Sequence, residues 1–335
     1  MPPPASHAVA VLGLGTMGHG IAQSFASAGH TVYCFEERLE VRQTLHERVA
    51  NNLRELVRQG LLAAPDVSAI LERLILTASE QEAVRQAPFI TEAVWEDLDV
   101  KRALLARLED WVADDAILAS NSSAFPISQS GDRLRHPERA VVTHWFNPPH
   151  LVPVVEVVPG PRTSPETTER ALRLLRQIGK HAIHVRKELP GFLVNRVQVA
   201  LMREVWNLVE QGVAAVDDID AAIRGSMGFR LAVQGPLEVY DFGGLDIQAS
   251  AFRNLVPTLR DGAEIPDAVR QLIDAGYLGY KSGRGFHDYP SNDNDKRRIR
   301  RDRLFLRLAQ LLREHDSQLP SELSRPIAEE RKASP

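Results

Sequence analysis

AVAVLGLGTMGHGIAQSFASAGHTVYCFE, residues 8–36, is the stretch of sequence that decides the fold. An apolar run suited to a β-strand, residues 8–12, leads through a glycine-rich turn into a helical segment, residues 17–28. A second strand-like run, residues 31–35, follows and ends at an acidic residue. A strand, a glycine-rich turn, a helix and a second strand in this order are typical of the βαβ unit that binds dinucleotides. We therefore predict a Rossmann-type unit here.

The turn between the first strand and the helix carries the pattern G-x-G-x-x-G. Its first glycine permits a tight turn, its second lets the backbone approach a pyrophosphate, and its third allows the helix to pack closely on the strand. The N-terminus of the helix offers free N–H groups and the positive end of its dipole to the phosphates. A glycine-rich turn of an unrelated α/β protein is the alternative, which the matching strand, helix and acid disfavour. The expected cofactor-binding residues are Gly13, Leu14, Gly15, Thr16, Met17 and Gly18.

Glu36, at the end of the second strand, indicates which dinucleotide is bound. It stands about 20 residues after the first glycine, where an acidic side chain accepts hydrogen bonds from the adenosine ribose hydroxyls. A carboxylate there would repel the 2′-phosphate of NADP, so the prediction is NAD. Arg38 leaves the NADP alternative open, because an arginine just past the strand can accept a 2′-phosphate.

Strand-like and helical segments alternate through the first 189 residues. This alternation predicts a mostly parallel sheet with helices on both faces. A long helix is expected over residues 39–60, because apolar residues recur on one face of it. Further strands are expected at 74–77, 89–91, 116–119, 140–143, 154–158 and 182–185, and further helices at 100–111 and 165–178.

The character of the chain changes after Pro190-Gly191. Residues 192–211 and 217–224 look helical, and no clear strand follows them. The predicted fold class is therefore α/β, with an N-terminal Rossmann-type, mostly parallel sheet domain followed by an all-α C-terminal domain. The predicted parts are an NAD-binding domain at 1–189, a helical substrate and dimerisation domain at 190–291, and a charged helical tail at 292–335 that is partly disordered.

Composition excludes several classes of protein. The net charge of −4 gives no general attraction to nucleic acid or to an anionic membrane, and no apolar run is long enough to span a bilayer. The single cysteine, Cys34, excludes an internal disulfide and a multi-cysteine metal site. The basic run at 296–301 suggests nucleic-acid binding, but a solvated helix face is the favoured interpretation in an acidic chain. We expect a cytoplasmic protein with no metal, no membrane contact and no nucleic-acid partner.

A histidine and a glutamate suggest a catalytic pair. His144 lies at the end of one expected strand, where α/β sheets bind their ligands, and Glu156 lies in the next strand-like run, Val-Val-Glu-Val-Val. A carboxylate in such an apolar setting is costly to bury unless it is paired. A histidine partner would satisfy it, and the imidazole could then act as the general base that alcohol oxidation requires. From spacing alone, a purely structural pair is the alternative.

Several motifs together resemble those of the L-3-hydroxyacyl-CoA dehydrogenases. The resemblance extends from about residue 8 to residue 289, which is nearly the whole chain apart from the tail. Its motifs are SNSS at 120–123, HWFNP at 144–148, VEV at 155–157, PGFLVNR at 190–196, GPLE at 235–238 and GYKSGRGF at 279–286.

The resemblance implies roles for individual residues. His144 would be the general base, with Glu156 as its orienting partner. Ser123 would bond the substrate oxygen and Asn195 would complete the site, although a turn-capping serine and a backbone-bonded asparagine are the alternatives. Four further positions match residues that contact the cofactor in the family: Glu96, Lys101, Asn147 and Lys281, of which Lys281 could equally be a solvated surface lysine. The family also implies a homodimer formed through the helical domain.

Two departures from the family bear on the substrate. The coenzyme A-handling enzymes carry a serine and a lysine where this chain has Asn52 and Gln59, although Arg54 and Arg58 lie nearby. The segment 225–236 is longer than in the short-chain enzymes and resembles the branch that contains lambda-crystallin and the L-gulonate 3-dehydrogenases. Arg230 in this segment is a candidate for binding a free carboxylate, because a guanidinium can bond both carboxylate oxygens.

The leading hypothesis is a reversible NAD-dependent oxidation of a 3-hydroxy group to a 3-keto group, of the 3-hydroxyacyl-CoA dehydrogenase type. The small-molecule substrate is then an acyl-CoA. Two alternatives stay open. One is a dehydrogenase of a free hydroxy acid or alcohol, such as a gulonate-like or carnitine-like compound. The other is a non-catalytic, crystallin-like protein that retains the NAD site, which the complete set of Ser123, His144, Glu156 and Asn195 argues against.

Overall fold

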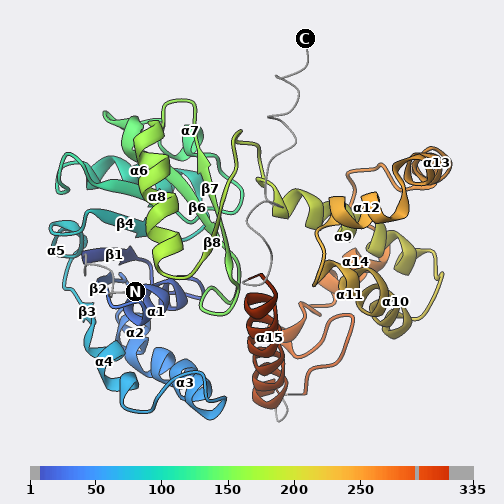
Figure 1. The fold of residues 1–335 in the computed structure, drawn as a ribbon, viewed down its shortest axis with the longest axis horizontal. Coiled ribbons are helices and arrows are strands. Elements are labelled where there is room, and N and C mark those ends of the chain that lie inside the picture. The colour runs from blue at the N-terminus through green and yellow to red at the C-terminus, as the bar shows by residue number, and fades with distance from the viewer. Residues whose placement is uncertain (1–7, 291–293, 317–335) are drawn as a thin grey trace. The chain divides into compact units, whose positions relative to one another are not determined.

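The computed structural model describes residues 8–290 and 294–316 (Figure 1). The chain divides into two compact units between Val199 and Ala200, within helix α9 (Val194–Glu210). Residues 317–335, which include the segment expected to be disordered, lie outside the described residues.

The first unit is built around one eight-stranded sheet with the order β3-β2-β1-β4-β5-β6-β7-β8. All neighbouring strands are parallel except β6 and β7, which are antiparallel. This confirms the mostly parallel sheet. The strands are β1 Ala8–Leu12, β2 Thr31–Phe35, β3 Leu74–Leu76, β4 Phe89–Glu92, β5 Ile117–Ser120, β6 Ala140–Trp145, β7 Val154–Pro159 and β8 His181–His184.

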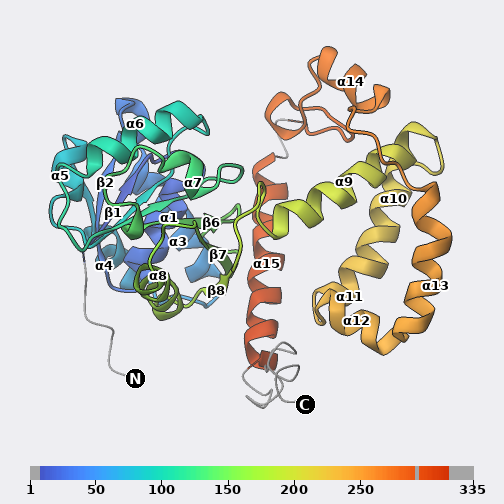
Figure 2. The same ribbon diagram turned by 90° about the horizontal axis from the view of Figure 1, so that it is seen from above.

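Helices cover both faces of this sheet (Figure 2). One apolar cluster joins β-strand residues such as Val9 and Val157 to α1, α3 and α8. A second joins their neighbours in the strands, such as Ala10 and Val158, to α5, α6 and α7. Successive strand residues point to opposite faces, so the near-continuous apolar runs of the sequence feed both clusters. The helices of this unit are α1 Gly18–Ser27, α2 Leu39–Gln43, α3 Leu45–Arg58, α4 Asp66–Glu72, α5 Glu80–Val84, α6 Leu98–Leu108, α7 Ile127–Ser130 and α8 Pro165–Gln177, with a 3-10 turn at Pro137–Arg139.

The helix expected over residues 39–60 is interrupted. The structure has α2 and α3 in its place, separated at Thr44. The Thr44 hydroxyl donates to the carbonyl of Val41 at 3.0 Å. Such a bond from a threonine side chain to nearby backbone competes with helix continuation. The apolar periodicity of the sequence did not reveal this break.

The second unit is helical, as expected. Its described residues contain no strand beyond isolated bridges at Gly279, Arg284 and Asp288. After α9, its helices are α10 Val216–Ile223, a π-helix at Arg224–Gly228, α11 Phe229–Leu231, α12 Pro236–Gly243, α13 Leu245–Leu255, α14 Asp267–Asp274 and α15 Asn294–Asp316, with 3-10 turns at Val256–Thr258 and Tyr280–Ser282. No helix of the described residues is both long enough and apolar enough to cross a membrane.

Candidate active site

The glycine-rich turn lies between β1 and α1 and leaves little room for side chains. Gly13 has a φ of +86°, and a Cβ there would meet the backbone oxygen of Ala93 at 2.6 Å. A Cβ on Gly18 would lie 1.7 Å from the Gly13 oxygen, whereas a Cβ on Gly15 would meet nothing within 4 Å. The first and third glycines therefore let the turn close and the helix approach. The second faces open space, where a ligand can come close to the backbone.

This turn can accept a dinucleotide. Helix α1 has no side-chain cap, and the N–H groups of Gly15, Thr16 and Met17 bond to no acceptor among the described residues. Unbonded N–H groups at the N-terminus of a helix are suited to bind phosphate oxygens. The residues of the turn therefore fit the pyrophosphate of NAD.

Glu36 lies beside the turn at the end of β2 and is buried. One carboxylate oxygen accepts from the Leu14 N–H at 2.9 Å, and the other accepts from the Arg38 N–H at 3.2 Å. Each carboxylate oxygen can accept more than one bond, so ribose hydroxyls can still be bound. The Arg38 guanidinium, which could have donated hydrogen bonds to a 2′-phosphate, lies 3.3 Å from Glu36.

Arg48, on α3, is a residue near the cofactor turn that sequence reasoning missed. Its guanidinium donates to the carbonyls of Gly15 at 3.4 Å and Val41 at 3.0 Å, and to the Thr44 hydroxyl at 3.2 Å. These bonds connect the start of α3 to the phosphate-binding turn and place a cation beside it. No motif could have revealed the contact, because Arg48 is distant in sequence and reaches the turn only through tertiary packing.

His144 and Glu156 form a buried pair. The antiparallel register places His144 of β6 opposite Glu156 of β7, so the two side chains share one face of the sheet. His144 Nδ1 and Glu156 Oε2 lie 2.7 Å apart, and Glu156 has no exposed surface. The imidazole packs against the rings of Phe146 and Phe192, with centroid distances of 4.5 and 5.4 Å.

The other Glu156 oxygen is held by the backbone that begins α9. Oε1 accepts from the N–H groups of Leu193 at 3.1 Å and Val194 at 2.9 Å. The turn before these residues has positive φ angles at Gly191 (75°) and Phe192 (51°). A positive φ is uncommon for a residue with a bulky side chain. At Phe192 this conformation occurs where the ring is buried beside His144 and the N–H groups of Leu193 and Val194 point to Glu156.

Ser123, Glu96 and Asn195 form a second group at the carboxyl ends of the strands. Glu96 Oε1 accepts from the Ser123 N–H at 2.8 Å, the Ser122 hydroxyl at 2.6 Å and the Ala124 N–H at 3.1 Å. The Asn195 amide donates to the Ser123 carbonyl at 3.1 Å. The Ser123 residue itself is exposed.

The remaining candidates lie in different settings. Asn147 is exposed, on the loop after β6, at a cis peptide bond to Pro148. This loop also meets α1, because a Cβ on Gly20 would lie 2.7 Å from the Pro149 ring. Lys101 has no exposed surface and bonds to two carboxylates. Lys180, a residue that sequence reasoning missed, donates to the carbonyls of Pro149 and Val152 and so holds the Asn147 loop.

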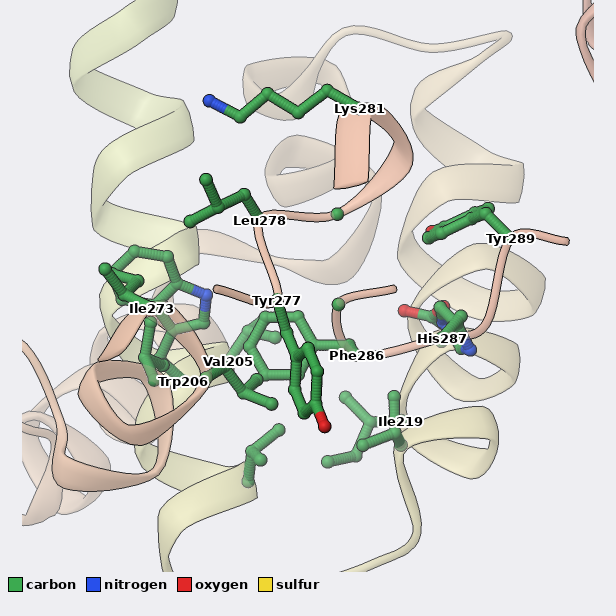
Figure 3. Close-up of a pocket in the computed structure, with 17 residues that line it drawn as sticks. Val205, Trp206, Ile219, Ile273, Tyr277, Leu278, Lys281, Phe286, His287 and Tyr289 are labelled. Carbon is green, nitrogen blue, oxygen red and sulfur yellow. The ribbon is translucent and has the colours of Figure 1, made fainter. Parts of the chain in front are cut away.

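Two candidates belong to the helical unit. Arg230, on α11, is exposed and donates to the Ser226 carbonyl at 3.4 Å. Lys281 lines a cavity of about 520 Å³ whose walls are mainly apolar. In Figure 3 the Lys281 side chain extends beside Leu278, at the end of the cavity away from Ile219.

Comparison with known proteins decides the family. The family model of the 3-hydroxyacyl-CoA dehydrogenase NAD-binding domain matches residues 8–189, and that of the C-terminal domain matches residues 191–289. The chain belongs to the 3-hydroxyacyl-CoA dehydrogenase family. The resemblance seen in the sequence is thereby confirmed, as is the expected NAD cofactor. The protein is an NAD-dependent oxidoreductase that acts on CH–OH groups.

Relatives within this family differ in their substrates. The 5-formyl-3-hydroxy-2-methylpyridine 4-carboxylate 5-dehydrogenase of Mesorhizobium japonicum is 35% identical over 284 residues, which are 84% of this chain and 90% of the relative. L-carnitine dehydrogenase from a Pseudomonas species is 40% identical over 269 residues, 79% of this chain and 83% of the relative. The 3-hydroxyadipyl-CoA dehydrogenase of Escherichia coli is 35% identical over 283 residues, 84% of this chain and 58% of the relative.

A solved structure supports the same assignment. The crystal structure of a 5-formyl-3-hydroxy-2-methylpyridine 4-carboxylic acid 5-dehydrogenase, described as an NAD+-dependent dismutase, has a TM-score of 0.85 with 31% sequence identity. The match covers 92% of this chain and 99% of that chain. The fold is therefore shared over both units.

Alanine at Gly18 and alanine at Gly15 should both weaken NAD binding, but only the first should lower the stability of the protein. Gly18→Ala forces a methyl group against the Gly13 carbonyl, so we expect the thermal unfolding midpoint to fall by several degrees and NAD binding to weaken. Gly15→Ala meets no protein atom, so we expect unchanged stability and weaker NAD binding. Calorimetry and fluorescence titration with NADH measure the two effects. Equal stability of the two variants would contradict this account of the turn.

Proposed function

We propose that the protein oxidises the hydroxyl group of a small free hydroxy acid or related alcohol, with His144 as the general base. The observation that carries the proposal is the 2.7 Å contact between His144 Nδ1 and Glu156 Oε2. A carboxylate only accepts hydrogen bonds, so Nδ1 carries the hydrogen and Nε2 is left with a lone pair. Nε2 is therefore the atom that can take the proton of a substrate hydroxyl.

Glu156 keeps the imidazole in this tautomer and orientation. Its carboxylate is fixed by His144 on one oxygen and by two backbone N–H groups on the other. It can therefore stabilise the imidazolium that forms when Nε2 takes the proton. NAD, when bound, supplies the hydride acceptor. Ser123 would hold the substrate oxygen, and its residue is exposed. Asn195 donates to the Ser123 carbonyl, the backbone bond that was the alternative to a direct substrate contact, so it would complete the site by fixing Ser123.

Five groups would hold the cofactor. The N–H groups of the glycine-rich turn bind the pyrophosphate, and Glu36 binds the adenosine ribose. Glu96 and Asn147, at the carboxyl ends of the strands, are available to the nicotinamide half. Lys281 is assigned to the cofactor by the family resemblance, and its ammonium could meet a phosphate or ribose oxygen.

The surroundings of α3 favour a substrate without coenzyme A. The two positions that bind coenzyme A in the family hold neutral side chains: the Asn52 amide donates to Gln23 at 2.9 Å, and the Gln59 amide donates to Glu55 at 2.9 Å. The nearby cations are also hydrogen-bonded, since Arg54 donates to Asn51 and Arg58 to Glu55. The relatives that act on carnitine and on a pyridine carboxylate point in the same direction. A coenzyme A thioester, the substrate class of the Escherichia coli relative, is the alternative.

The helical unit supports the expected homodimer. Within residues 200–290, the buried residues are only Asn207, Ile219, Pro266 and Val269. Large apolar side chains on α12 and α13 are solvent-exposed, among them Phe242 at 77% and Phe252 at 67%. Exposed apolar surface of this extent is unusual for a monomer and marks an association surface. We infer that a second copy of the chain covers it.

Loss of the base should reduce the rate and leave cofactor binding intact. We expect His144→Ala to lower kcat/KM by about 10²- to 10⁴-fold, the usual contribution of a general base, while NADH affinity stays within about twofold of the parent, a change of less than 0.5 kcal/mol. His136→Ala, at an exposed histidine, is the matched control. The assay follows NADH absorbance with 3-hydroxybutyryl-CoA, 3-hydroxybutyrate, carnitine and gulonate. Activity confined to the thioester would contradict the free-acid proposal, and full activity of His144→Ala would contradict the assigned base.

Arg230 is expected to bind the substrate carboxylate. A hydrogen bond to a charged group contributes about 1.5–3 kcal/mol, so Arg230→Ala should raise KM for carboxylate substrates by about 10- to 100-fold. Arg253→Ala, at another exposed arginine of the helical unit, is the control. Initial-rate kinetics over the same substrates provide the measurement. An unchanged KM for every carboxylate would remove Arg230 from the site.

The dimer has a direct test. Light scattering after size exclusion should give twice the chain mass of 37.3 kDa. Phe242→Asp and Phe252→Asp should dissociate the dimer, because a charge cannot be buried unpaired in an apolar interface. Leu61→Asp, at an exposed leucine of the first unit, should leave the mass unchanged. A monomeric parent protein at micromolar concentration would refute the proposal.

A further inference from the structure

A buried network of three charges lies behind the Ser123 loop, and Lys101 is at its centre. Lys101 Nζ lies 2.9 and 3.0 Å from the two oxygens of Glu92 and 3.2 Å from Glu96 Oε2. An ammonium group has three hydrogens to donate, and these three contacts can occupy all of them. The side chain has no exposed surface. Lys101 therefore presents no donor to a ligand at the surface.

Glu92 anchors one end of the network within the sheet. It is the last residue of β4 and lies in register with Ser120, the last residue of β5, whose hydroxyl donates to it. The Val94 N–H donates to its other oxygen at 3.2 Å. Burial raises the pKa of Glu92, while the Lys101 ammonium and these donors oppose that rise. The carboxylate is thus fixed in place but depends on Lys101 for a counter-charge.

Glu96 forms the other end of the network, and it alone reaches solvent. Its side chain is 38% exposed, in contrast to the fully buried Glu92 and Lys101. One of its oxygens meets Lys101, and the other accepts from the hydroxyl and N–H groups of residues 122–124. Although burial alone would raise the pKa of Glu96, Lys101 and these donors lower it below its ordinary value. Glu96 therefore stays ionised and holds the loop that carries Ser123.

We propose that Lys101 is a positioning residue that acts on the active site through Glu96, with Glu92 as its buried counter-ion, and does not touch the cofactor. The ammonium bonds to Glu92 at the end of β4 and to Glu96, so it keeps the Glu96 carboxylate in a fixed position relative to strands β4 and β5. Glu96 in turn sets the backbone of Ser123, to which Asn195 also bonds. The proposal deepens the proposed function, because it concerns the geometry of the same site. It replaces the direct cofactor contact that the family resemblance implied for Lys101.

A double-mutant cycle between Lys101 and Glu96 distinguishes a positioning role of Lys101 from direct contact with the cofactor. Removing Lys101 alone would leave Glu92 buried without a counter-charge, so all four proteins of the cycle carry Glu92→Gln, which keeps a partner for Ser120. The other substitutions are Lys101→Met and Glu96→Ala, singly and together. Thermal unfolding first verifies that each variant is folded. Arg102→Met, at the neighbouring cation of α6 that pairs with Asp132, is the matched control.

With Glu96 present, we expect Lys101→Met to lower kcat by about 10- to 100-fold, since small misplacements of a catalytic group have effects of this size. In the Glu96→Ala background the same substitution should change kcat and the Kd for NADH by less than about twofold, because the two residues act as one unit. Lys101→Gln, which can still donate to Glu96, should recover part of the rate.

Two results would overturn the proposal. One is a several-fold rise in the Kd for NADH caused by Lys101→Met in the Glu96→Ala background, which would mean direct contact with the cofactor. The other is an unchanged kcat in the variant that retains Glu96. Neither depends on the identity of the base, because a failure of the proposed function would appear separately, as full activity of His144→Ala.

Discussion

A carboxylate that is fully removed from solvent is costly unless each of its oxygens is hydrogen-bonded, and Glu156 meets this requirement in a way that organises the candidate active site. One oxygen binds the imidazole of His144 and the other binds the two N–H groups at the start of α9. Glu156 thereby connects strands β6 and β7 to the start of helix α9 and to His144. Removing it would leave a buried imidazole and the N–H groups of Leu193 and Val194 without their acceptor.

The sheet topology explains why the other functional groups gather near this pair. Strands β1, β4, β5 and β6 are parallel, so their carboxyl ends lie along one edge of the sheet. The glycine-rich turn follows β1, Glu92 and Ser120 are the last residues of β4 and β5, and His144 is the last residue but one of β6. Strand β7 runs in the opposite direction and brings Glu156 back to the same edge. The order of the strands reverses beside β1, which is where open α/β sheets bind their ligands.

The two units of the chain differ in how many of their apolar side chains they bury. The first has two apolar clusters and is stabilised by its own core. The helical unit buries few of its apolar side chains within one chain, and the proposed homodimer would add to its stability by covering them. The family assignment establishes the cofactor and the reaction class. In the proposed function the substrate is decided by residues such as Arg230 and the neutral pair Asn52 and Gln59, because the fold alone does not specify a substrate.

The sequence by itself determined the local features of this protein. Ala8–Leu12, Thr31–Phe35 and the glycine pattern between them predicted the βαβ unit, because strand and helix periodicity and glycine conformations are properties of short segments. The motifs around Ser123, His144 and Asn195 predicted the family. The break between α2 and α3 at Thr44 was not predicted, since a single side-chain bond to the backbone leaves the apolar pattern intact.

Only the tertiary structure decided which distant residues meet. It brought Arg48 to the glycine turn, and it placed Lys101 between Glu92 and Glu96 beneath the surface. Sequence spacing cannot distinguish a lysine that faces a ligand from one buried behind the site, because the two differ only in packing. Strand register, which no local pattern specifies between separate strands, also set His144 opposite Glu156.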